Sequence, residues 1–435
     1  MQNPQIEFIN HASVIVSNGE QSVLSDPWYQ GDAFHKGWNL LHEFNDNEIN
    51  NLLDRVTHIW ISHEHPDHFS ISFFKKFKQK ITDRNIFILF QQTDDKRVES
   101  FLRGNKFSVR ILEFNKWIEL GSDFKVLNFK DGFYDSGLAI QTLNKKILNL
   151  NDCEVKTKER CNEILNHVGE CDVMISQFSY AAWKGGKANI SWRKKAASEK
   201  LATLELQANK FKPKYLIPFA SYVYFSNKKN FYLNDCSNKP GDVINFLTPK
   251  IDAKIKIMMP FEKFNFQNNF ENEKSLNFWN EKFNSIKPTN QFNLIELEDL
   301  QESFKKYTAR IFKNNSKFFI RLSRLVSPIS VFKPIIIHLD DHNINVSLDI
   351  MSESIKISEA RPDVEMSSES LFFIMQNTFG FDTLTVNGCF EEISKNGFSK
   401  MTKSLAIENL NNICIKFNFF IIFNFKLIHL FIGRL

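Results

Sequence analysis

The first 260 residues alternate between short apolar runs and longer stretches in which apolar residues recur every three or four positions. Short apolar runs bounded by turn residues are typical of buried strands, and the longer periodic stretches are typical of helices. Strands are expected at residues 13–16, 22–24, 58–62, 86–90, 125–129, 138–143, 146–150, 173–176 and 215–218. Helices are expected at 71–79, 94–103 and 191–211.

This order of elements predicts the fold class. Most of the expected strands are apolar at successive positions, as in strands whose two faces are both covered. Two sheets packed face to face, with helices on the outside, satisfy this pattern. We therefore expect an α/β protein with an αββα sandwich in its first part.

A second, smaller α+β domain is expected after the sandwich. Residues 265–293 are polar and rich in Asn, Phe and Glu, and they are interpreted as a linker. A helix is then expected at 294–311, strands at 335–339, 345–350 and 354–357, and a helix at 368–376. The expected division is thus 1–264 for the catalytic domain, 265–293 for the linker and 294–435 for the accessory domain.

Composition excludes several classes of protein. Hydrophobic residues make up 43% and charged residues 24%, which is ordinary for a globular protein. The net charge of +5 is small and no basic stripe is evident, so nucleic-acid binding is not expected. The apolar stretch 417–432 is interrupted by Asn418, Asn424, Lys426 and His429, which favours burial in the second domain over a membrane span.

The cysteines and the N-terminus indicate the compartment. The six cysteines form no C-x-x-C pair, which favours free thiols in a reducing environment. The chain enters a strand-like pattern at Ile6 without the basic and apolar regions of a secretory signal. These two features predict a cytoplasmic protein.

The strongest chemical signal is the run His63-Glu64-His65-Pro66-Asp67-His68, which follows an apolar strand. His63 and His65 are two positions apart, so their side chains can converge where the loop is extended. Asp67 and His68 follow a proline turn and can reach the same point from another side. Imidazole and carboxylate together suit zinc, iron or manganese, so this run predicts a metal site.

The run resembles the H-x-H-x-D-H signature of the metallo-β-lactamase superfamily. This resemblance implies that His63 and His65 bind one metal ion and that Asp67 and His68 bind a second. It also implies that Asp152, at the end of an expected strand, completes or bridges the two sites. Asp67 is further expected to orient the reacting water or to take its proton.

The chain departs from that superfamily at two places. The stretch 131–136 has no histidine for the first site, and the late strand end 216–221 has no final histidine. The site can therefore be mononuclear, or oxygen ligands such as Asp131, Tyr134 or Asp135 can fill the gap. More oxygen ligation favours iron over zinc, and the number of ions, one or two, stays open.

A narrower resemblance involves three further segments, Asn10-His11-Ala12-Ser13, Ser25-Asp26-Pro27-Trp28 and the stretch from Ala33 to Glu43. They are similar to segments of the CMP-N-acetylneuraminate hydroxylases. This implies a sialic-acid-type sugar or sugar nucleotide as substrate, in surface-glycan modification. His11 and Asp26 are then expected to orient metal ligands. The expected substrate-binding residues are Trp38, His42, Tyr180 and Trp183.

Those hydroxylases also contain a Rieske iron–sulfur domain, which requires two cysteines and two histidines. The cysteines here lack the required spacings, so any oxygenation is expected to need a separate Rieske or ferredoxin-type electron donor. The second domain loosely resembles sterol-carrier-protein-type domains around Thr385-Val386-Asn387-Gly388.

Three functions remain open on the sequence. The leading one is a hydroxylase-like metalloenzyme acting on a sugar or sugar nucleotide. The second is a metal-dependent hydrolase of a phosphodiester, lactone or amide. The third is a protein that binds a sugar nucleotide without turnover.

Overall fold

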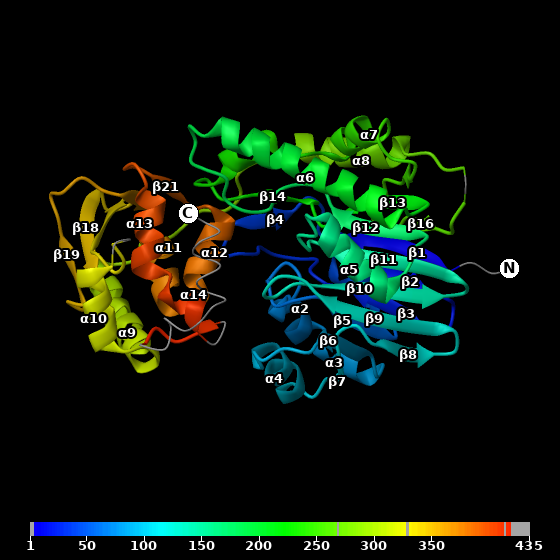
Figure 1. The fold of residues 1–435 in the computed structure, drawn as a ribbon, viewed down its shortest axis with the longest axis horizontal. Coiled ribbons are helices and arrows are strands. Elements are labelled where there is room, and N and C mark those ends of the chain that lie inside the picture. The colour runs from blue at the N-terminus through cyan, green and yellow to red at the C-terminus, as the bar shows by residue number, and fades with distance from the viewer. Residues whose placement is uncertain (1–3, 268, 328–329, 413–414, 419–435) are drawn as a thin grey trace.

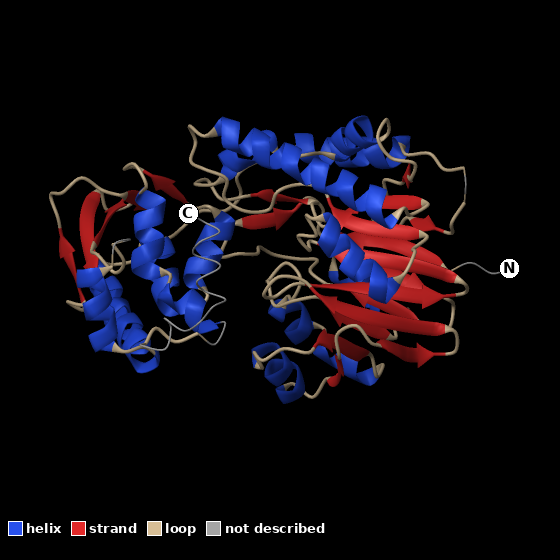
Figure 2. Ribbon diagram, viewed as in Figure 1, coloured by secondary structure: helices blue, strands red, loops and turns tan. Residues whose placement is uncertain are grey.

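The computed structural model describes residues 4–267, 269–327, 330–412 and 415–418. Two seven-stranded sheets pack face to face in the N-terminal part, and a five-stranded sheet with its own helices follows (Figures 1 and 2). Helices cover the outer faces of the two large sheets, so the N-terminal part is the expected αββα sandwich. The apolar stretch 417–432 was expected to be buried in the second domain, and its residues 419–432 lie outside the described part of the chain.

The first large sheet combines an antiparallel half and a parallel half. Its strands, in spatial order, are β16 (Lys263–Phe264), β1 (Gln5–Asn10), β2 (Ser13–Ser17), β3 (Ser22–Ser25), β5 (His58–Ile61), β6 (Phe87–Gln91) and β7 (Ser108–Leu112). The strands from β3 to β7 are parallel, and the helices between them are α1 (Asp46–Leu53), α2 (Ile71–Lys76), α3 (Lys78–Asp83) and α4 (Arg97–Gly104).

The second large sheet repeats this arrangement. Its strands, in spatial order, are β15 (Lys254–Ile255), β13 (Tyr215–Phe219), β12 (Val173–Gln177), β11 (Lys145–Asn151), β10 (Ser136–Thr142), β9 (Phe124–Lys130) and β8 (Trp117–Gly121). Its parallel half, β11 to β15, is connected through α5 (Lys158–Val168), α6 (Ile190–Phe211) and α7 (Pro240–Leu247).

The strand residues alternate between two cores, as the period of two in a strand requires. Trp60 of β5 points into the core between the two sheets, whereas its neighbours Ile59 and Ile61 pack under the outer helices. All three side chains are fully buried. The burial of both faces explains why the sequence shows continuous apolar runs here instead of alternation with polar residues.

The stretch expected to be an irregular linker contains helix α8 (Glu273–Asn284). Its Trp279 is fully buried, stacks on Tyr222 with ring centroids 4.1 Å apart, and donates a hydrogen bond from Nε1 to the carbonyl of Met258 at 2.8 Å. Helix α8 therefore packs on the sandwich as one of its outer elements.

The remaining elements form the C-terminal region and the segments that contact it. A two-stranded ribbon of β4 (Trp38–Leu40) and β14 (Val223–Phe225), followed by η1 (Phe231–Cys236), lies between the sandwich and this region. The five-stranded sheet has the order β19 (Ser354–Ile357), β18 (Ile344–Asp349), β17 (Ile335–Leu339), β20 (Val364–Met366) and β21 (Phe390–Glu392). Its helices are α9 (Leu297–Asn314), α10 (Lys317–Val326), α11 (Ser368–Gln376), α12 (Gly380–Asn387), α13 (Gly397–Leu405) and α14 (Ile407–Asn412).

The segment 33–40 docks the C-terminal region onto the sandwich. Phe34 and Trp38 belong to the same hydrophobic core as α9, α11 and the five-stranded sheet. Asn387 of α12 donates a hydrogen bond from Nδ2 to the carbonyl of Phe34 at 3.0 Å. A Cβ atom at Gly37 would lie 2.4 Å from Cβ of Asn387, so only glycine permits this approach.

None of the described helices is long and apolar enough to cross a membrane.

Candidate metal centre

The chemically active side chains lie where strand ends of the two large sheets meet. His63, His65, Asp67 and His68 follow β5, and Asp26 follows the neighbouring β3. From the second sheet, Asp152 follows β11 and Asp135 precedes β10, which pairs with β11. Because the carboxyl ends of parallel strands share one edge, residues from both sheets converge there, as in other open α/β sheets.

Three strand ends around the centre have left-handed backbone conformations. The φ angles are 35° at Asp26, 55° at Asn151 and 44° at Ala220. Such values are unfavourable for residues other than glycine, and they are enriched at functional sites. Here they turn the chain sharply at each strand end and direct the following side chains inward.

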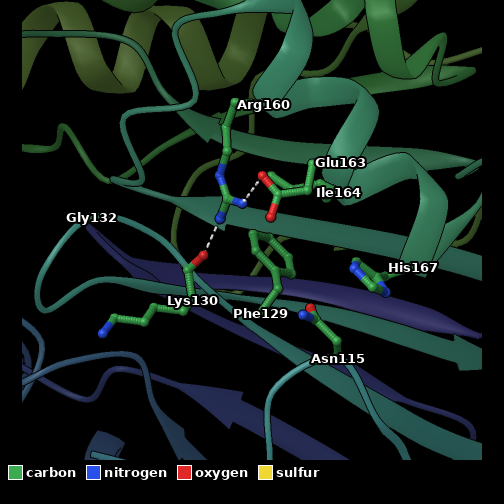
Figure 3. A pocket seen from close by; sticks show the side chains of 8 residues that line it. All are labelled: Asn115, Phe129, Lys130, Gly132, Arg160, Glu163, Ile164 and His167. Atoms are coloured by element: carbon green, nitrogen blue, oxygen red, sulfur yellow. Dashed lines mark hydrogen bonds and ion pairs between the residues drawn. The ribbon is translucent and has the colours of Figure 1, made fainter.

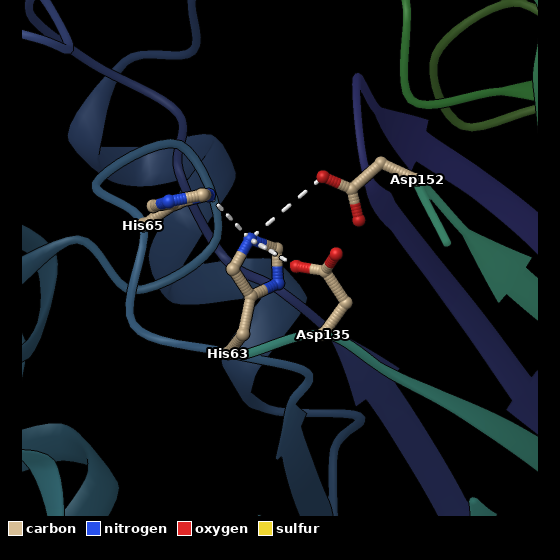
Figure 4. A group of neighbouring side chains, drawn as sticks. All are labelled: His63, His65, Asp135 and Asp152. Carbon is tan, nitrogen blue, oxygen red and sulfur yellow. Dashed lines mark hydrogen bonds and ion pairs between the residues drawn. The ribbon is translucent and has the colours of Figure 1, made fainter. Parts of the chain in front are cut away.

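The first group consists of His63, His65, Asp135 and Asp152 (Figure 4). Nε2 of His63 lies 2.8 Å from Nδ1 of His65, 3.6 Å from Oδ1 of Asp135 and 3.7 Å from Oδ2 of Asp152. His63 is fully buried, whereas the side chains of His65, Asp135 and Asp152 are 20–27% exposed. This group is thus open to solvent on one side.

The second group consists of His11, Asp67 and His68. Oδ2 of Asp67 lies 3.3 Å from Nε2 of His11 and 3.2 Å from Nε2 of His68. The two groups meet at Asp152, whose Oδ2 is also 3.4 Å from Nε2 of His68. Asp152 therefore lies between the two groups, and its bridging role stays a prediction.

These residues fit divalent metal ions. Two ligand atoms that are each about 2.0–2.2 Å from one ion lie roughly 3–3.5 Å apart, close to the separations seen here. Oδ1 of Asp67 and Oδ1 of Asp152 are buried without a hydrogen-bond partner, which is costly unless a cation contacts them. Nitrogen and carboxylate oxygen are also the donors that zinc, iron and manganese accept.

Burial and neighbouring charges shift the pKa values of two residues in these groups. Burial, together with the nearby charge of Asp152, raises the pKa of Asp135 to about 8. Burial opposes a charge on His68, but the carboxylates of Asp67, Asp152 and Asp26 outweigh it and raise its pKa well above the usual range. A divalent cation would remove the repulsion between the carboxylates and release this proton.

Asp26 forms a hydrogen bond with the ring of His68. Its Oδ2 accepts a hydrogen bond from Nδ1 of His68 at 2.9 Å, so that Nε2 faces Asp67 and Asp152. Asp26 also accepts hydrogen bonds from the backbone and hydroxyl of Ser62, both at 2.8 Å, and from Nδ2 of Asn151. The carboxylate is thus held rigidly by three residues.

We expect Asp26→Asn to weaken metal binding by roughly 10–100-fold, the usual effect of changing a group that orients a ligand. The amide cannot accept all of these hydrogen bonds, so His68 loses its fixed direction. The measurement is competition for metal against a chromophoric chelator. Asp46→Asn, at a side chain 52% exposed on α1, serves as the control and should bind metal like the unchanged protein. Equal affinities in both variants would contradict the orienting role.

His11 was expected to orient ligands, but the structure brings it into the second group itself. Its backbone carbonyl accepts a hydrogen bond from the amide of Ala220 at 2.8 Å, directly after β13. This is the strand end at which the sequence lacked a final histidine. His11, from the turn between β1 and β2, thus lies beside this strand end.

Of the two carboxylates expected to fill the first site, the structure brings Asp135 into a metal-suited group and leaves Asp131 outside it. Asp131 instead accepts a hydrogen bond from Nε of Arg160 at 3.0 Å. Arg160 also contacts the carbonyl of Lys130 and the side chain of Glu163, in a pocket that no residue of the two metal-suited groups lines (Figure 3). The side chain of Tyr134 lines a cavity next to His65.

Two of the four residues expected to bind substrate, Trp38 and Trp183, are buried among aromatic side chains. Trp38 packs between Phe34 and Phe225, and Trp183 packs against Phe390 and Phe398 of the C-terminal region. The C-terminal region thus covers the indole of Trp183, whereas Trp38 lines a small pocket together with Tyr180.

The other two residues expected to bind substrate, Tyr180 and His42, also contact neighbouring residues. Tyr180 is buried and donates a hydrogen bond to the carbonyl of Leu233. The imidazole of His42 packs against Phe44 and Phe278. None of the four lines the cavity next to His65.

That cavity has a volume of about 480 Å³ and lies between the sandwich and the C-terminal region. His65 and Tyr134 form part of its wall, together with Phe34 and His35 from the segment that follows Trp28. From the C-terminal region, Asp382 of α12 approaches Nε2 of His65 to 3.8 Å. No sequence signal indicated Asp382, because it is more than 300 positions from His65.

Part of the chain is similar in sequence to known hydroxylases. It is 26% identical over 270 residues to the cytidine monophosphate-N-acetylneuraminic acid hydroxylase of Cricetulus griseus, a match that covers 57% of this chain and 46% of that protein. The enzyme of the same name from Asterias rubens is 27% identical over 275 residues, covering 59% and 40% respectively. The match thus spans less than half the length of these relatives. No family model matches the chain.

Among solved structures, CmlA, a diiron β-hydroxylase from Streptomyces venezuelae, superposes with a TM-score of 0.44 at 12% identity. This superposition covers 61% of this chain and 55% of CmlA. The sequence resemblance, the αββα sandwich and the histidine–carboxylate groups at its sheet edge agree with one another. The chain is similar in sequence to part of the CMP-N-acetylneuraminic acid hydroxylases, and its αββα sandwich brings histidines and carboxylates together at one edge of the sheets.

Proposed function

We propose that this protein is a hydroxylase with a dinuclear non-haem iron centre. The observation that carries the proposal is the composition of the two groups. The second group is two histidines and one carboxylate, His11, His68 and Asp67. The first contains two histidines and Asp135, and Asp152 lies between both groups.

Two histidines and one carboxylate with open positions are the ligand set typical of non-haem Fe(II) oxygenases. The open side of the first group, where His65, Asp135 and Asp152 are partly exposed, leaves room for a further ligand. Catalytic zinc sites commonly use three protein ligands as well, but the share of carboxylate oxygen here favours iron over zinc.

The side chains have distinct tasks in this proposal. Asp152 holds the two groups at a fixed separation, and Asp26 with Ser62 keeps His68 in one orientation. Bound iron would supply the redox activation of dioxygen. Asp67 is enclosed by His11 and His68, which supports a ligand role; its role as proton acceptor stays a prediction.

The overall reaction is insertion of one oxygen atom into a C–H bond. Substrate, dioxygen, two electrons and two protons give the hydroxylated product and water, so the reaction needs an electron donor. We propose a separate Rieske or ferredoxin-type protein as that donor. Because the chain is similar to the CMP-N-acetylneuraminic acid hydroxylases, CMP-N-acetylneuraminate and free N-acetylneuraminate are included in the assay as reference compounds.

The test compares iron-loaded and zinc-loaded protein under ¹⁸O₂ with a ferredoxin, its reductase and NADPH. Oxygen uptake that requires both iron and the donor, with ¹⁸O in a product detected by mass spectrometry, is the expected result. Turnover of an ester, lactone or phosphodiester by zinc-loaded protein, without dioxygen or donor, would establish the rival hydrolase instead. The chelated, metal-free protein should be inactive in both assays.

A further inference from the structure

The cavity next to His65 is lined by many apolar side chains, unlike a site that binds a charged nucleotide. Phe34, Phe69 and Phe101 come from the sandwich, and Phe373 and Phe379 come from the C-terminal region. Ile71 and Phe379 face this space with 47% and 46% of their surface exposed. Large apolar side chains left this accessible inside a cavity indicate a ligand that covers them.

The charges of the lining disfavour a polyanion. Among the described residues that line the cavity, Asp32, Glu64 and Asp382 are acidic, and Arg97 is the single arginine or lysine. The guanidinium of Arg97 is already paired with Asp95 at 2.5 Å. A phosphate placed here would therefore meet three carboxylates, and the described lining offers it neither a lysine nor an unpaired arginine.

Two side-chain contacts connect the sandwich side of the cavity with the C-terminal side. Asp382 of α12 lies 3.8 Å from His65, and the ring of His35 stacks on Phe373 of α11 with centroids 3.9 Å apart. The C-terminal region thus forms one complete wall of a chamber whose opposite wall includes a residue of the first metal-suited group. A molecule in this chamber would lie beside the open side of that group.

We propose that the cavity binds an uncharged, mainly hydrocarbon substrate body, an aromatic ring or an acyl chain, with the carbon to be oxidised near His65. A volume of about 480 Å³ is within the range of sites for small organic molecules. This inference rests on the proposed hydroxylase for the fate of the substrate, but the binding itself does not require turnover. It assigns the C-terminal region a direct part in substrate selection.

The experiment is a fluorescence titration of zinc-loaded full-length protein with the neutral aromatic probe N-phenyl-1-naphthylamine. Saturable binding of one probe per chain is expected. Naphthalene and methyl decanoate serve as competitors, and their relative strength distinguishes an aromatic ring from an acyl chain. CMP and CMP-N-acetylneuraminate at millimolar concentration should not displace the probe.

Two exposed lining residues test the location. Phe379→Ala and Ile71→Ala should each weaken probe binding by roughly tenfold, because each removes apolar surface from the wall. Phe318→Ala on α10, at a side chain 76% exposed outside the cavity, is the matched control and should bind like the unchanged protein. All three sites are exposed, so the variants should fold.

The proposal is overturned if probe binding is not saturable, if both cavity variants bind like the control, or if CMP compounds displace the probe. Because zinc-loaded protein without a donor is used, these outcomes are independent of oxygenase activity. A negative oxygenase assay with intact probe binding would reject the proposed hydroxylase and leave the cavity assignment standing.

Discussion

Replacement of Asp152 by alanine should abolish activity and reduce metal affinity by more than the roughly 10–100-fold expected from a group that merely orients a ligand. The reason is its place between the two groups, with Oδ2 3.7 Å from Nε2 of His63 and 3.4 Å from Nε2 of His68. Losing this carboxylate removes an oxygen donor from both groups. The measurement is the number of iron ions bound per chain after dialysis.

Asp131→Asn is the matched control for this variant. Asp131 is also a buried aspartate near β9 and β10, but it pairs with Arg160 and belongs to neither group. The control should retain the metal content of the unchanged protein. If Asp152→Ala bound as much iron as this control, the bridging position assigned to Asp152 would be wrong.

Trp279→Ala should lower the free energy of unfolding by about 3–5 kcal/mol, the usual cost of truncating a buried aromatic residue to alanine. The indole is fully buried, stacks on Tyr222 and fills space against Phe8 of β1. The substitution leaves a cavity at the junction of α8 and the sandwich. The measurement is urea unfolding followed by circular dichroism.

Asn277→Ala, at an exposed position of the same helix, is the control for this stability measurement. Surface substitutions of this kind usually change stability by less than about 0.5 kcal/mol. A similar, small effect of both variants would mean that α8 is not an integral part of the sandwich.

The strand core could be predicted from the sequence because its signal is local. The expected strands at 58–62 and 146–150 correspond to β5 (His58–Ile61) and β11 (Lys145–Asn151). Strands buried on both faces are apolar at every position, and such runs are easily recognised.

Helices at the surface were predicted less well. The expected helix at 71–79 is divided at Phe77 into α2 and α3. Helix α8 was missed altogether, because its apolar positions are interspersed with Asn, Lys and Glu and only Ser275, Trp279 and Phe283 are buried. With apolar residues on so narrow a stripe, the periodic signal is weak.

The candidate site was predictable where a local motif or the family resemblance marked its residues. The run from His63 to His68 and the strand-end Asp152 could be identified, and the structure brings them together. The contribution of His11 depends on the proximity of the β1–β2 turn to the end of β13, which is more than 200 residues away. Long-range placement of this kind follows from tertiary packing, which a local pattern does not contain.

The central claim is a dinuclear centre formed by two histidine–carboxylate groups. It is tested most directly by anaerobic titration of metal-free protein with ferrous iron, with bound and free iron measured after equilibrium dialysis. The account predicts two ions per chain in the unchanged protein and one in His11→Ala, which loses a donor from the second group alone. Saturation at a single ion in the unchanged protein, or two tightly bound ions in His11→Ala, would contradict it.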